Sequence, residues 1–387
     1  MHVIYLLTNL LTLYGEQSRS SWHIARYKEK MTEEGSTISH LSVAMPTNEA
    51  DNAQTTEGKT MQSSSSIIEF YFQWAVVVIG VIGMATNALI LYALVVSKQQ
   101  KKHVLIVNQN ALDLFSSFFL ALVYSLKLCN LRLTGAFSYW LCMMLLSELL
   151  IWWGLIGSVV NLAIITIDRY LKVVHHTWSK RLLRPWVINS AMAFAWFVGI
   201  VANTPFMFAT SGVINGACYA WVLYESNVAR TASMIWYIVS FYFIILITFI
   251  FCYGRILIVV HRQARVMASH STQGSNTSQT QSHHIQTNVI KTMILVSAFY
   301  AILWLPANVY YLFIILDTNL TYIDVHYYAS MFIAFLYTTV NPFIYATKFD
   351  PVKKVLRDMI PCKKTCVQPT EGGTETTRVR NVACTRM

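Results

Sequence analysis

Asn87, Asp113, Ser158 and Asn341 are polar residues that lie deep inside long apolar stretches of the chain. A charged side chain at the centre of a bilayer costs about 2.5–3.5 kcal/mol, so such residues are expected to pair with one another or to serve a function. Asp113 is the most informative, because a carboxylate in an apolar medium must take up a proton or find a cation. A hydrogen-bond network that packs helices together is the alternative interpretation.

The composition predicts that these stretches lie in lipid. Of the 387 residues, 55% are hydrophobic and only 12% are charged, and the mean hydropathy is +0.46. A soluble domain usually carries about 25% charged residues, since its surface must be solvated. The excess apolar surface therefore excludes a water-soluble globule.

Seven apolar segments are long enough to cross a bilayer as helices, which takes about 20 residues each. They occupy residues 68–97, 104–129, 139–171, 186–210, 233–260, 288–316 and 327–347. We therefore predict an all-α membrane protein, with a seven-transmembrane helix bundle over residues 67–349. Residues 1–66 are predicted to be an extracellular disordered tail, and residues 350–387 an amphipathic helix and cytoplasmic tail.

The basic residues mark one side of the membrane. The formal net charge is +11, but Lys and Arg gather in the connections after odd-numbered spans rather than on one face, so no nucleic-acid surface is expected. By the positive-inside rule, this side is cytoplasmic and the N-terminus is extracellular. The apolar run at residues 3–13 leaves open whether a signal peptide is removed.

Short motifs fall on these segments in a fixed order. They are Asn87 in Thr-Asn-Ala-Leu-Ile-Leu, Asp113 in Asn-Ala-Leu-Asp-Leu, Asp168-Arg169-Tyr170, Trp196, Tyr253, Trp304-Leu305-Pro306 and Asn341-Pro342-Phe343-Ile344-Tyr345. Together they resemble the rhodopsin-like (class A) G-protein-coupled receptors over residues 68–362. The resemblance implies a plasma-membrane receptor, not an enzyme, which transmits the binding of an extracellular ligand to a cytoplasmic heterotrimeric G protein.

The resemblance also assigns an activation switch. Arg169 would pair with Asp168 at rest and be released to the G protein, although a snorkelling arginine is an alternative. Trp304 would lie beneath a ligand cavity or simply pack, and Pro306 would kink the sixth span. The other implied members are Tyr170, Tyr253, Asn341, Pro342 and Tyr345, with Tyr253 and Tyr345 as partners in the active arrangement.

A sodium pocket formed by Asp113, Ser158 and Asn341 is a further implication, with Asn87 in the same polar core. Oxygen ligands of this kind suit a hard cation, and Tyr337 occupies a position that often supplies another ligand in the family. A hydrogen-bonded Asp113 without an ion is the alternative. Apart from this sodium ion, no cofactor is expected.

The outer ends of the spans are expected to form the ligand pocket. By depth and helical phase, its wall would include Glu148, Trp152, Trp304, Asn308, Tyr311 and Tyr328. Aromatic residues with few charges suit a peptide terminus or a modest organic molecule, and we expect a peptide. Amine receptors carry a carboxylate where this chain has Ile151, so an amine bound by Glu148 is the alternative. A channel or transporter is less favoured, because no repeated half is visible.

The resemblance pairs Cys142 with Cys218 in a disulfide. Cys142 stands 27 positions before Arg169, slightly more than is usual in the family, so Cys129 remains a competitor. A second departure is Ile245, which stands where the fifth span of the family usually has proline.

Several modification sites and partners complete the expectations. Cys362 and Cys366 follow the amphipathic segment 349–360 and are candidates for palmitoylation, while Asn319 in Asn-Leu-Thr is a glycosylation candidate. A receptor kinase would place phosphates on the Ser/Thr-rich linker and tail, and these phosphates would recruit arrestin. Membrane lipid is the remaining expected partner.

Overall fold

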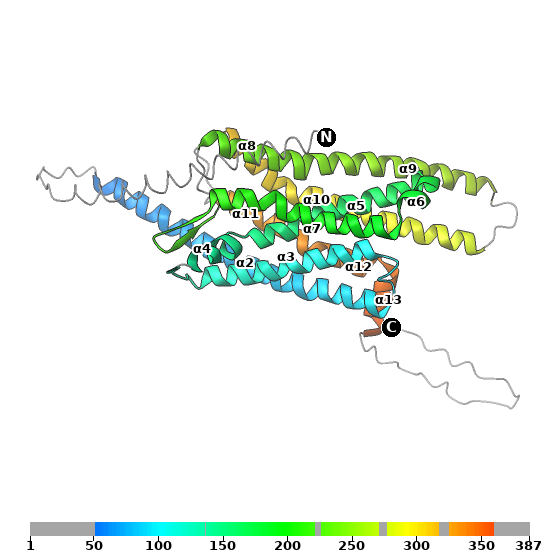
Figure 1. Cartoon of the computed structure of the whole chain (residues 1–387), viewed down its shortest axis with the longest axis horizontal. Helices are drawn as coiled ribbons and strands as arrows, with labels where there is room; N and C mark the ends of the chain where they lie inside the picture. Colours follow the sequence, from blue (N-terminus) through cyan, green and yellow to red (C-terminus); the bar gives the residue numbers. More distant parts are fainter. Residues whose placement is uncertain (1–50, 136, 221–225, 271–276, 317–324, 360–387) are drawn as a thin grey trace, which may run out of the picture.

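The computed structural model describes residues 51–135, 137–220, 226–270, 277–316 and 325–359, and its helices run side by side along one long axis (Figure 1). Within these residues, seven helical stretches are long and apolar enough to cross a membrane. They are Ser66–Val96, Val104–Leu128, Phe137–Val174, Pro185–Thr210, Val228–Gln263, Asn288–Leu316 and Val325–Lys348. This confirms the predicted bundle and the order of its spans.

Four of the spans are single helices. They are α2 (Asp51–Val96), α3 (Val104–Leu128), α7 (Pro185–Thr210) and α10 (Thr277–Leu316). The first two pack closely, because a Cβ added at Gly80 of α2 would lie 2.6 Å from the backbone nitrogen of Ala121 in α3. Small residues of this kind let membrane helices approach each other.

The other three spans are interrupted. Their parts are α4 (Phe137–Leu141), η1 (Cys142–Leu146) and α5 (Leu149–Val174) in the third span, α8 (Asn227–Ile238), η2 (Val239–Phe243) and α9 (Ile244–His270) in the fifth, and α11 (Val325–Phe335) and α12 (Tyr337–Lys348) in the seventh. Both η1 and η2 are π-helical turns, which often occur at functional positions. The η2 turn ends two residues before Ile245, the position where the family usually has proline.

Three short elements lie outside the spans. Helix α6 (His176–Leu182) precedes α7, and strands β1 (Gly212–Ile214) and β2 (Ala217–Tyr219) form an antiparallel hairpin after it. Its turn is Asn215-Gly216, with φ values of 52° and 76°. An Asn-Gly pair favours this conformation, because both positions of a tight hairpin turn need positive φ.

The predicted eighth helix is α13 (Asp350–Met359), which packs against α12 and α2. Val352 is fully buried and Leu356 joins the core, whereas Lys353, Lys354 and Arg357 are exposed. This division of apolar and basic faces confirms the amphipathic helix.

Helix α2 extends N-terminal to the predicted first span. The composition of residues 1–66 predicts disorder, but α2 already begins at Asp51. A helix formed by the apolar span extends at little cost, since each added residue gains one hydrogen bond after nucleation, and no proline stands between Pro46 and the span. Residues 1–50 and 360–387 lie outside the described part of the chain.

Candidate ligand and signalling site

An outer cavity opens between the third, fourth, fifth, sixth and seventh spans. Its lining consists of Trp152, Ala202, Asn203, Phe206, Ser233, Met234, Trp236, Tyr237, Tyr311 and Tyr327. Trp152 and Tyr311 are two of the predicted pocket residues. The lining is largely aromatic, and none of these described residues is charged.

A second cavity adjoins the first and is lined by residues of the third, fifth and sixth spans. Its lining consists of Leu155, Ile156, Val159, Tyr237, Phe241, Tyr242, Tyr300, Trp304 and Asn308. Tyr237 lines both cavities. Trp304 and Asn308, also predicted from the sequence, therefore belong to this second cavity.

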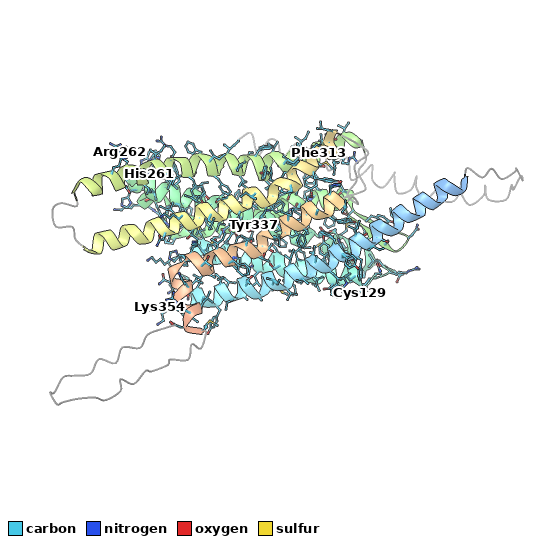
Figure 2. All side chains as sticks on the ribbon, turned by 180° about the vertical axis from the view of Figure 1, so that it is seen from behind. Cys129, His261, Arg262, Phe313, Tyr337 and Lys354 are labelled. Atoms are coloured by element: carbon cyan, nitrogen blue, oxygen red, sulfur yellow. A yellow bond between two sulfur atoms is a disulfide. The ribbon has the colours of Figure 1, made fainter. Side chains whose placement is uncertain are left out.

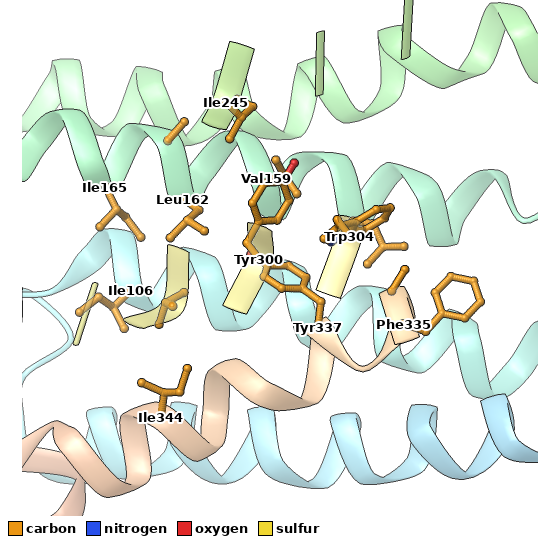
Figure 3. Packing of buried hydrophobic residues seen from close by; sticks show 14 of the residues in the cluster. Ile106, Val159, Leu162, Ile165, Ile245, Tyr300, Trp304, Phe335, Tyr337 and Ile344 are labelled. Carbon is orange, nitrogen blue, oxygen red and sulfur yellow. The ribbon is translucent and has the colours of Figure 1, made fainter. Parts of the chain in front are cut away.

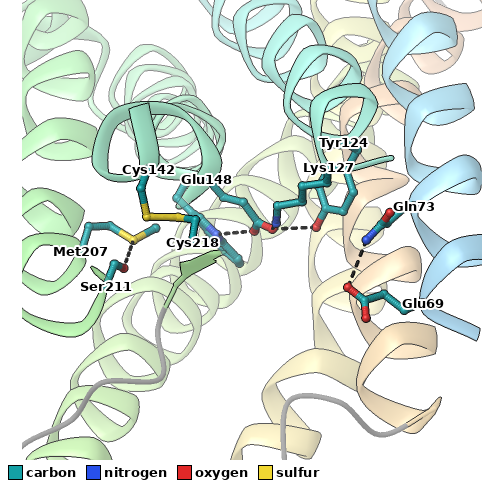
Figure 4. Close-up of polar contacts among 10 residues, drawn as sticks. Glu69, Gln73, Tyr124, Lys127, Cys142, Glu148, Met207, Ser211 and Cys218 are labelled. Atoms are coloured by element: carbon teal, nitrogen blue, oxygen red, sulfur yellow. Dashed lines mark hydrogen bonds and ion pairs between the residues drawn. A yellow bond between two sulfur atoms is a disulfide. The ribbon is translucent and has the colours of Figure 1, made fainter. Parts of the chain in front are cut away.

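Glu148 and Tyr328, the other two residues of the predicted pocket wall, line neither of these two cavities. Glu148 forms an ion pair with Lys127 and accepts hydrogen bonds from Tyr124 Oη at 2.9 Å and Trp152 Nε1 at 3.3 Å (Figure 4). Tyr328 packs on Phe72 of α2, with ring centroids 4.9 Å apart. Protein partners thus hold both side chains.

The outer part of the third span explains the unusual spacing of Cys142. The π-helical turn η1 widens the helix, and Glu148 then takes the left-handed conformation with φ of 68° before α5 begins. These two irregularities accommodate the additional residues before Arg169. A disulfide joins Cys142 to Cys218 in β2, with Cα atoms 5.4 Å apart, whereas Cys129 is free and exposed (Figure 4).

Asp113 lies at the centre of a buried polar core. Its Oδ1 accepts a hydrogen bond from Ser158 Oγ at 2.5 Å, and its Oδ2 accepts one from Asn341 Nδ2 at 2.9 Å. Gln109 Nε2 donates to Ser158 and lies 3.4 Å from Tyr337 Oη. The structure therefore brings Asp113, Ser158, Asn341 and Tyr337 together as the sequence predicts.

Gln109 is the member of this core that the sequence reasoning missed. It stands four positions before Asp113, so both side chains project from the same face of α3. Its Oε1 accepts from Asn161 Nδ2 at 2.8 Å, and Asn161 Oδ1 accepts from Asn108 Nδ2 at 2.9 Å. Asn108 Oδ1 in turn accepts from Trp196 Nε1 at 3.0 Å. The network thus links α3, α5 and α7.

Asn87 has a role separate from that of the Asp113 carboxylate. Its Nδ2 donates to the carbonyl oxygens of Gly83 and Thr338, each at 2.9 Å. Pro342 stands four positions after Thr338 and has no N–H to offer that carbonyl. Asn87 therefore replaces the missing helical hydrogen bond and joins the first span to the seventh.

A row of packed rings leads from the cavities to the polar core (Figure 3). The ring centroids of Trp152 and Trp304 are 6.1 Å apart, those of Trp304 and Tyr300 are 6.3 Å apart, and those of Tyr300 and Tyr337 are 5.7 Å apart. Tyr337 Oη lies 3.4 Å from Ser158 Oγ. The cavity floor and Asp113 are thus connected by direct contacts.

The Asp-Arg-Tyr motif lies at the opposite end of α5 from the cavities. Arg169 Nε lies 3.6 Å from Asp168 Oδ2, and Lys172 Nζ lies 2.8 Å from the same carboxylate. Tyr170 Oη forms a hydrogen bond with His175 Nε2 at 3.1 Å. Asp168 is therefore shared between two cations.

The two tyrosines implied to pair on activation have different surroundings. Tyr253 Oη is hydrogen-bonded to Thr166 at 3.0 Å and to Ser297 at 3.1 Å. Tyr345 is fully buried, and among the described residues its Oη has no hydrogen-bond partner. Their direct or water-bridged pairing in an active arrangement remains a prediction.

Comparison with known proteins identifies the family. A sequence profile described as "7 transmembrane receptor (rhodopsin family)" matches residues 86–345. The chain belongs to this family. The fold of the receptor is also similar to that of squid rhodopsin, with a TM-score of 0.60. The two sequences are 16% identical, and the match covers 79% of this chain and 89% of the squid chain. At this identity, the likeness shows the fold alone.

Individual relatives of the receptor are distant. The Substance-K receptor of Mesocricetus auratus is 27% identical over 195 residues, which cover 49% of each chain, so the match spans about half of that relative's length. The Galanin receptor type 1 of Rattus norvegicus is 24% identical over 73% of this chain and 79% of its own. The Melatonin receptor type 1B of Mus musculus is 24% identical over about half of each chain.

His103 is a titratable group of the receptor that lies just outside the spans. It is 9% exposed and packs edge-on against Phe349, with ring centroids 4.9 Å apart. Burial, followed by the charges of Arg169, Lys102 and Lys172, lowers the pKa of His103 from 6.5 to about 4. The predicted modification sites Cys362, Cys366 and Asn319 lie outside the described residues.

Proposed function

We propose that this receptor transmits the binding of an extracellular peptide to a heterotrimeric G protein. The observation that carries the proposal is the row of rings from Trp152 through Trp304, Tyr300 and Tyr337 to the Asp113 core. A ligand that packs more tightly against one arrangement of these rings would favour that arrangement of the bundle. The polar core joins α3, α5 and α12, so a shift at the rings would reach all three spans.

The inner end of α5 is suited to release Arg169. Its only acidic partner among the described residues is Asp168, at 3.6 Å, and Lys172 competes for that carboxylate at 2.8 Å. Lys172 donates a hydrogen bond to this carboxylate, whereas Arg169 lies beyond hydrogen-bond distance, so Arg169 is the less closely held of the two cations. Arg169 would therefore become available to a G protein at small cost.

Two features favour a peptide over an amine. The outer cavity is aromatic and carries no charged side chain in its described lining, whereas Glu148, the nearest carboxylate, is paired with Lys127. Two of the relatives are named Substance-K receptor and Galanin receptor. A small organic ligand in the outer cavity is the second candidate, favoured by the aromatic lining of that cavity.

We also propose that the end of the bundle opposite the cavities faces the cytoplasm. Arg262 and Lys354 lie at that end, and Cys129 and Phe313 lie at the other (Figure 2). Anionic lipid on the inner leaflet would attract the exposed basic face of α13. This orientation places the N-terminus outside, and it puts the linker and tail where a receptor kinase and arrestin act.

A sodium ion at Asp113 is proposed as an allosteric modulator. The Asp113 carboxylate, the Ser158 hydroxyl and Asn341 Oδ1 are oxygen ligands of the type sodium prefers, and among the described atoms Asn341 Oδ1 is buried without a partner. Gln109 points its amide N–H groups at the same oxygens. Gln109→Ala removes the amide that competes with sodium for these oxygens, so sodium should then have a larger effect on agonist affinity. An unchanged or smaller effect of sodium would contradict a sodium site at Asp113.

The proposal can be tested with a peptide and small-molecule library on cells that express the receptor and a panel of G-protein sensors. We expect a peptide response that is lost in Arg169→Ala and kept in Arg262→Ala, which removes an exposed arginine at the same end. A response that survives Arg169→Ala equally well, or a response to small molecules alone, would contradict it.

A further inference from the structure

Arg230 faces the bundle from the outer end of the fifth span. Val228 and Ile235 are exposed and mark the outward face of α8. The opposite face of this helix consists of Arg230, Met234 and Tyr237, which are spaced by four and three residues and are buried or half-buried. Met234 and Tyr237 line the outer cavity. Arg230 therefore lies one helical turn above this cavity, on the face that borders it.

The guanidinium of Arg230 has no anion beside it. Its Nε is buried and forms no hydrogen bond in the described part of the chain. None of the described carboxylates lies within 4.0 Å of it, and Glu148 at the same end of the bundle is paired with Lys127. A cation that has lost part of its hydration gains when an anion reaches it. Since Arg230 is still partly exposed, an anionic group of a ligand can pair with it.

The start of α8 adds to the positive field around Arg230. The first turn of this helix carries no acidic residue, and its N-cap is the neutral Ser226, whose side chain accepts from Ala229 N at 3.1 Å. The N-terminus of a helix is the positive end of its dipole, so a cation there is unfavourable and an anion is favourable. The backbone and Arg230 thus both favour a negative charge at this place.

The position of Arg230 favours a ligand inside the bundle over a lipid headgroup. In a bilayer, lipid would contact the outward face of α8 that Val228 and Ile235 mark, whereas Arg230 lies on the other face. A ligand in the outer cavity would extend past this other face. Among the anions that such a ligand can carry, a carboxylate matches the planar guanidinium with two parallel N–H···O bonds.

We propose that Arg230 binds a carboxylate of the peptide ligand while the outer cavity holds a neighbouring aromatic residue of that peptide. Arg230 and Met234 are about 6 Å apart along the axis of α8, and an extended peptide advances about 3.3 Å per residue. The carboxylate therefore lies within one or two residues of the aromatic one, on a side chain or at the chain end. This inference rests on the proposed peptide-receptor function, because it assigns the charge that the peptide carries.

The test uses three probes of nearly the same size: N-acetyl-aspartyl-phenylalaninamide, N-acetyl-asparaginyl-phenylalaninamide, and N-acetyl-asparaginyl-phenylalanine with a free terminal carboxylate. Binding to purified receptor in a maltoside detergent is measured from the concentration dependence of the rise in melting temperature. We expect the aspartyl probe to bind about fivefold more tightly than the neutral probe, as for a partly exposed ion pair. The same gain for the free acid instead would support the proposal and assign the carboxylate to the peptide C-terminus. Equal affinities for all three probes, or no binding of either acidic probe, would overturn it.

Variants assign the contact to Arg230. In Arg230→Gln the acidic and neutral probes should bind equally, whereas Arg230→Lys should keep part of the preference, because it keeps the charge but not the planar fork. Arg132→Gln is the matched control, since Arg132 is an exposed arginine that follows α3 at the same end of the bundle. A preference that survives in Arg230→Gln, or that is lost equally in Arg132→Gln, would overturn the assignment.

Salt and lipid distinguish a ligand carboxylate from other anions. Potassium chloride at about 0.5 M should reduce the preference for the acidic probe, because it screens a partly exposed pair. Phosphatidylglycerol added to the detergent should leave the preference unchanged, since lipid contacts the other face of α8. Loss of the preference on adding this lipid would show that Arg230 pairs with a lipid phosphate and would overturn the proposal.

This experiment separates the inference from the proposed function. The melting temperature reports binding without a G protein, so a carboxylate preference that depends on Arg230 supports the inference even if no sensor responds. A receptor that signals in response to peptides but binds acidic and neutral probes equally retains the proposed function and loses the inference. The ranking of the probes on the unmodified receptor decides the matter even if a variant does not fold.

Discussion

The two parts of the third span are built in opposite ways. Before Glu148, the chain passes through α4, the π-helical turn η1 and a left-handed residue within twelve positions, Phe137–Glu148. After it, α5 continues without interruption from Leu149 to Val174. The outer part is held by a disulfide and an ion pair to other segments, and the inner part by buried side-chain hydrogen bonds.

This difference shows how one helix can serve two purposes. The inner part must hold Ser158 and Arg169 at fixed positions, and regular helical geometry achieves this because each residue is placed by its neighbours. The outer part instead carries the disulfide to Cys218 and the ion pair to Lys127, while Trp152 of α5 lines the outer cavity. Its geometry therefore depends on contacts with distant segments as well as on local hydrogen bonds.

The largest effect is expected from cutting the covalent link of the outer part. Cys142→Ser removes a disulfide between residues 76 positions apart, and loss of a native disulfide typically costs about 2–5 kcal/mol. We expect a lower melting temperature of purified receptor and weakened ligand binding. Cys129→Ser, which removes a free exposed thiol, is the control, and an equal loss in both variants would show that the disulfide does not support the outer part.

The inner part is tested by Ser158→Ala. This substitution removes the 2.5 Å hydrogen bond to the Asp113 side chain, and a buried acceptor that loses its partner costs about 1–3 kcal/mol. Ser117→Ala provides the comparison, because the Ser117 hydroxyl is also buried but bonds only to the Asp113 backbone carbonyl. Thermal unfolding should separate the two variants. If both lose the same stability, the side-chain network is not what holds the inner part.

The same division explains what the sequence could predict. The seven spans were predictable from span length and charge pattern. The meeting of Asp113, Ser158 and Asn341 was predictable from the resemblance to the receptor family. Gln109 could also have been found, because it stands one helical turn from Asp113. Each of these residues lies on a regular helix.

Glu148 and Tyr328 were assigned to the pocket wall by assuming that regular phase continued to the outer ends. The π-helical turn and the left-handed φ of Glu148 break that phase in the third span, where Lys127 pairs with Glu148. Tyr328, on α11 of the seventh span, packs on Phe72. Contacts between residues far apart in the chain decide both positions. Periodicity within one segment carries no information about them.

A pH experiment tests His103, which lies at the inner end of the bundle directly before α3. The folded-state pKa of His103 is about 4 against an ordinary value of 6.5, so the unfolded chain takes up a proton first as the pH falls. Stability is therefore unaffected above pH 6.5 and decreases below it, by about 2 kcal/mol at pH 5. Melting curves between pH 5 and 8 should lose this dependence in His103→Gln but keep it in His176→Gln, which changes an exposed histidine. An unchanged profile in His103→Gln would assign the acid sensitivity elsewhere.

The smallest effect is expected from the ion pair of the outer part. Glu148→Gln removes the charge attraction to Lys127 and keeps one acceptor oxygen, so the new side chain can accept from Tyr124 or from Trp152 but not from both. A partly exposed pair contributes about 0.2–1 kcal/mol and weakens with salt, so unmodified receptor should lose a small part of its thermal stability in high salt and the variant should not. Lys127→Met in the same background completes a double-mutant cycle. A coupling free energy as large as the loss of stability in Cys142→Ser would contradict this expectation. Charge attraction would then be acting in a site that excludes water, and the ion pair, not the disulfide, would be the main support of the outer part.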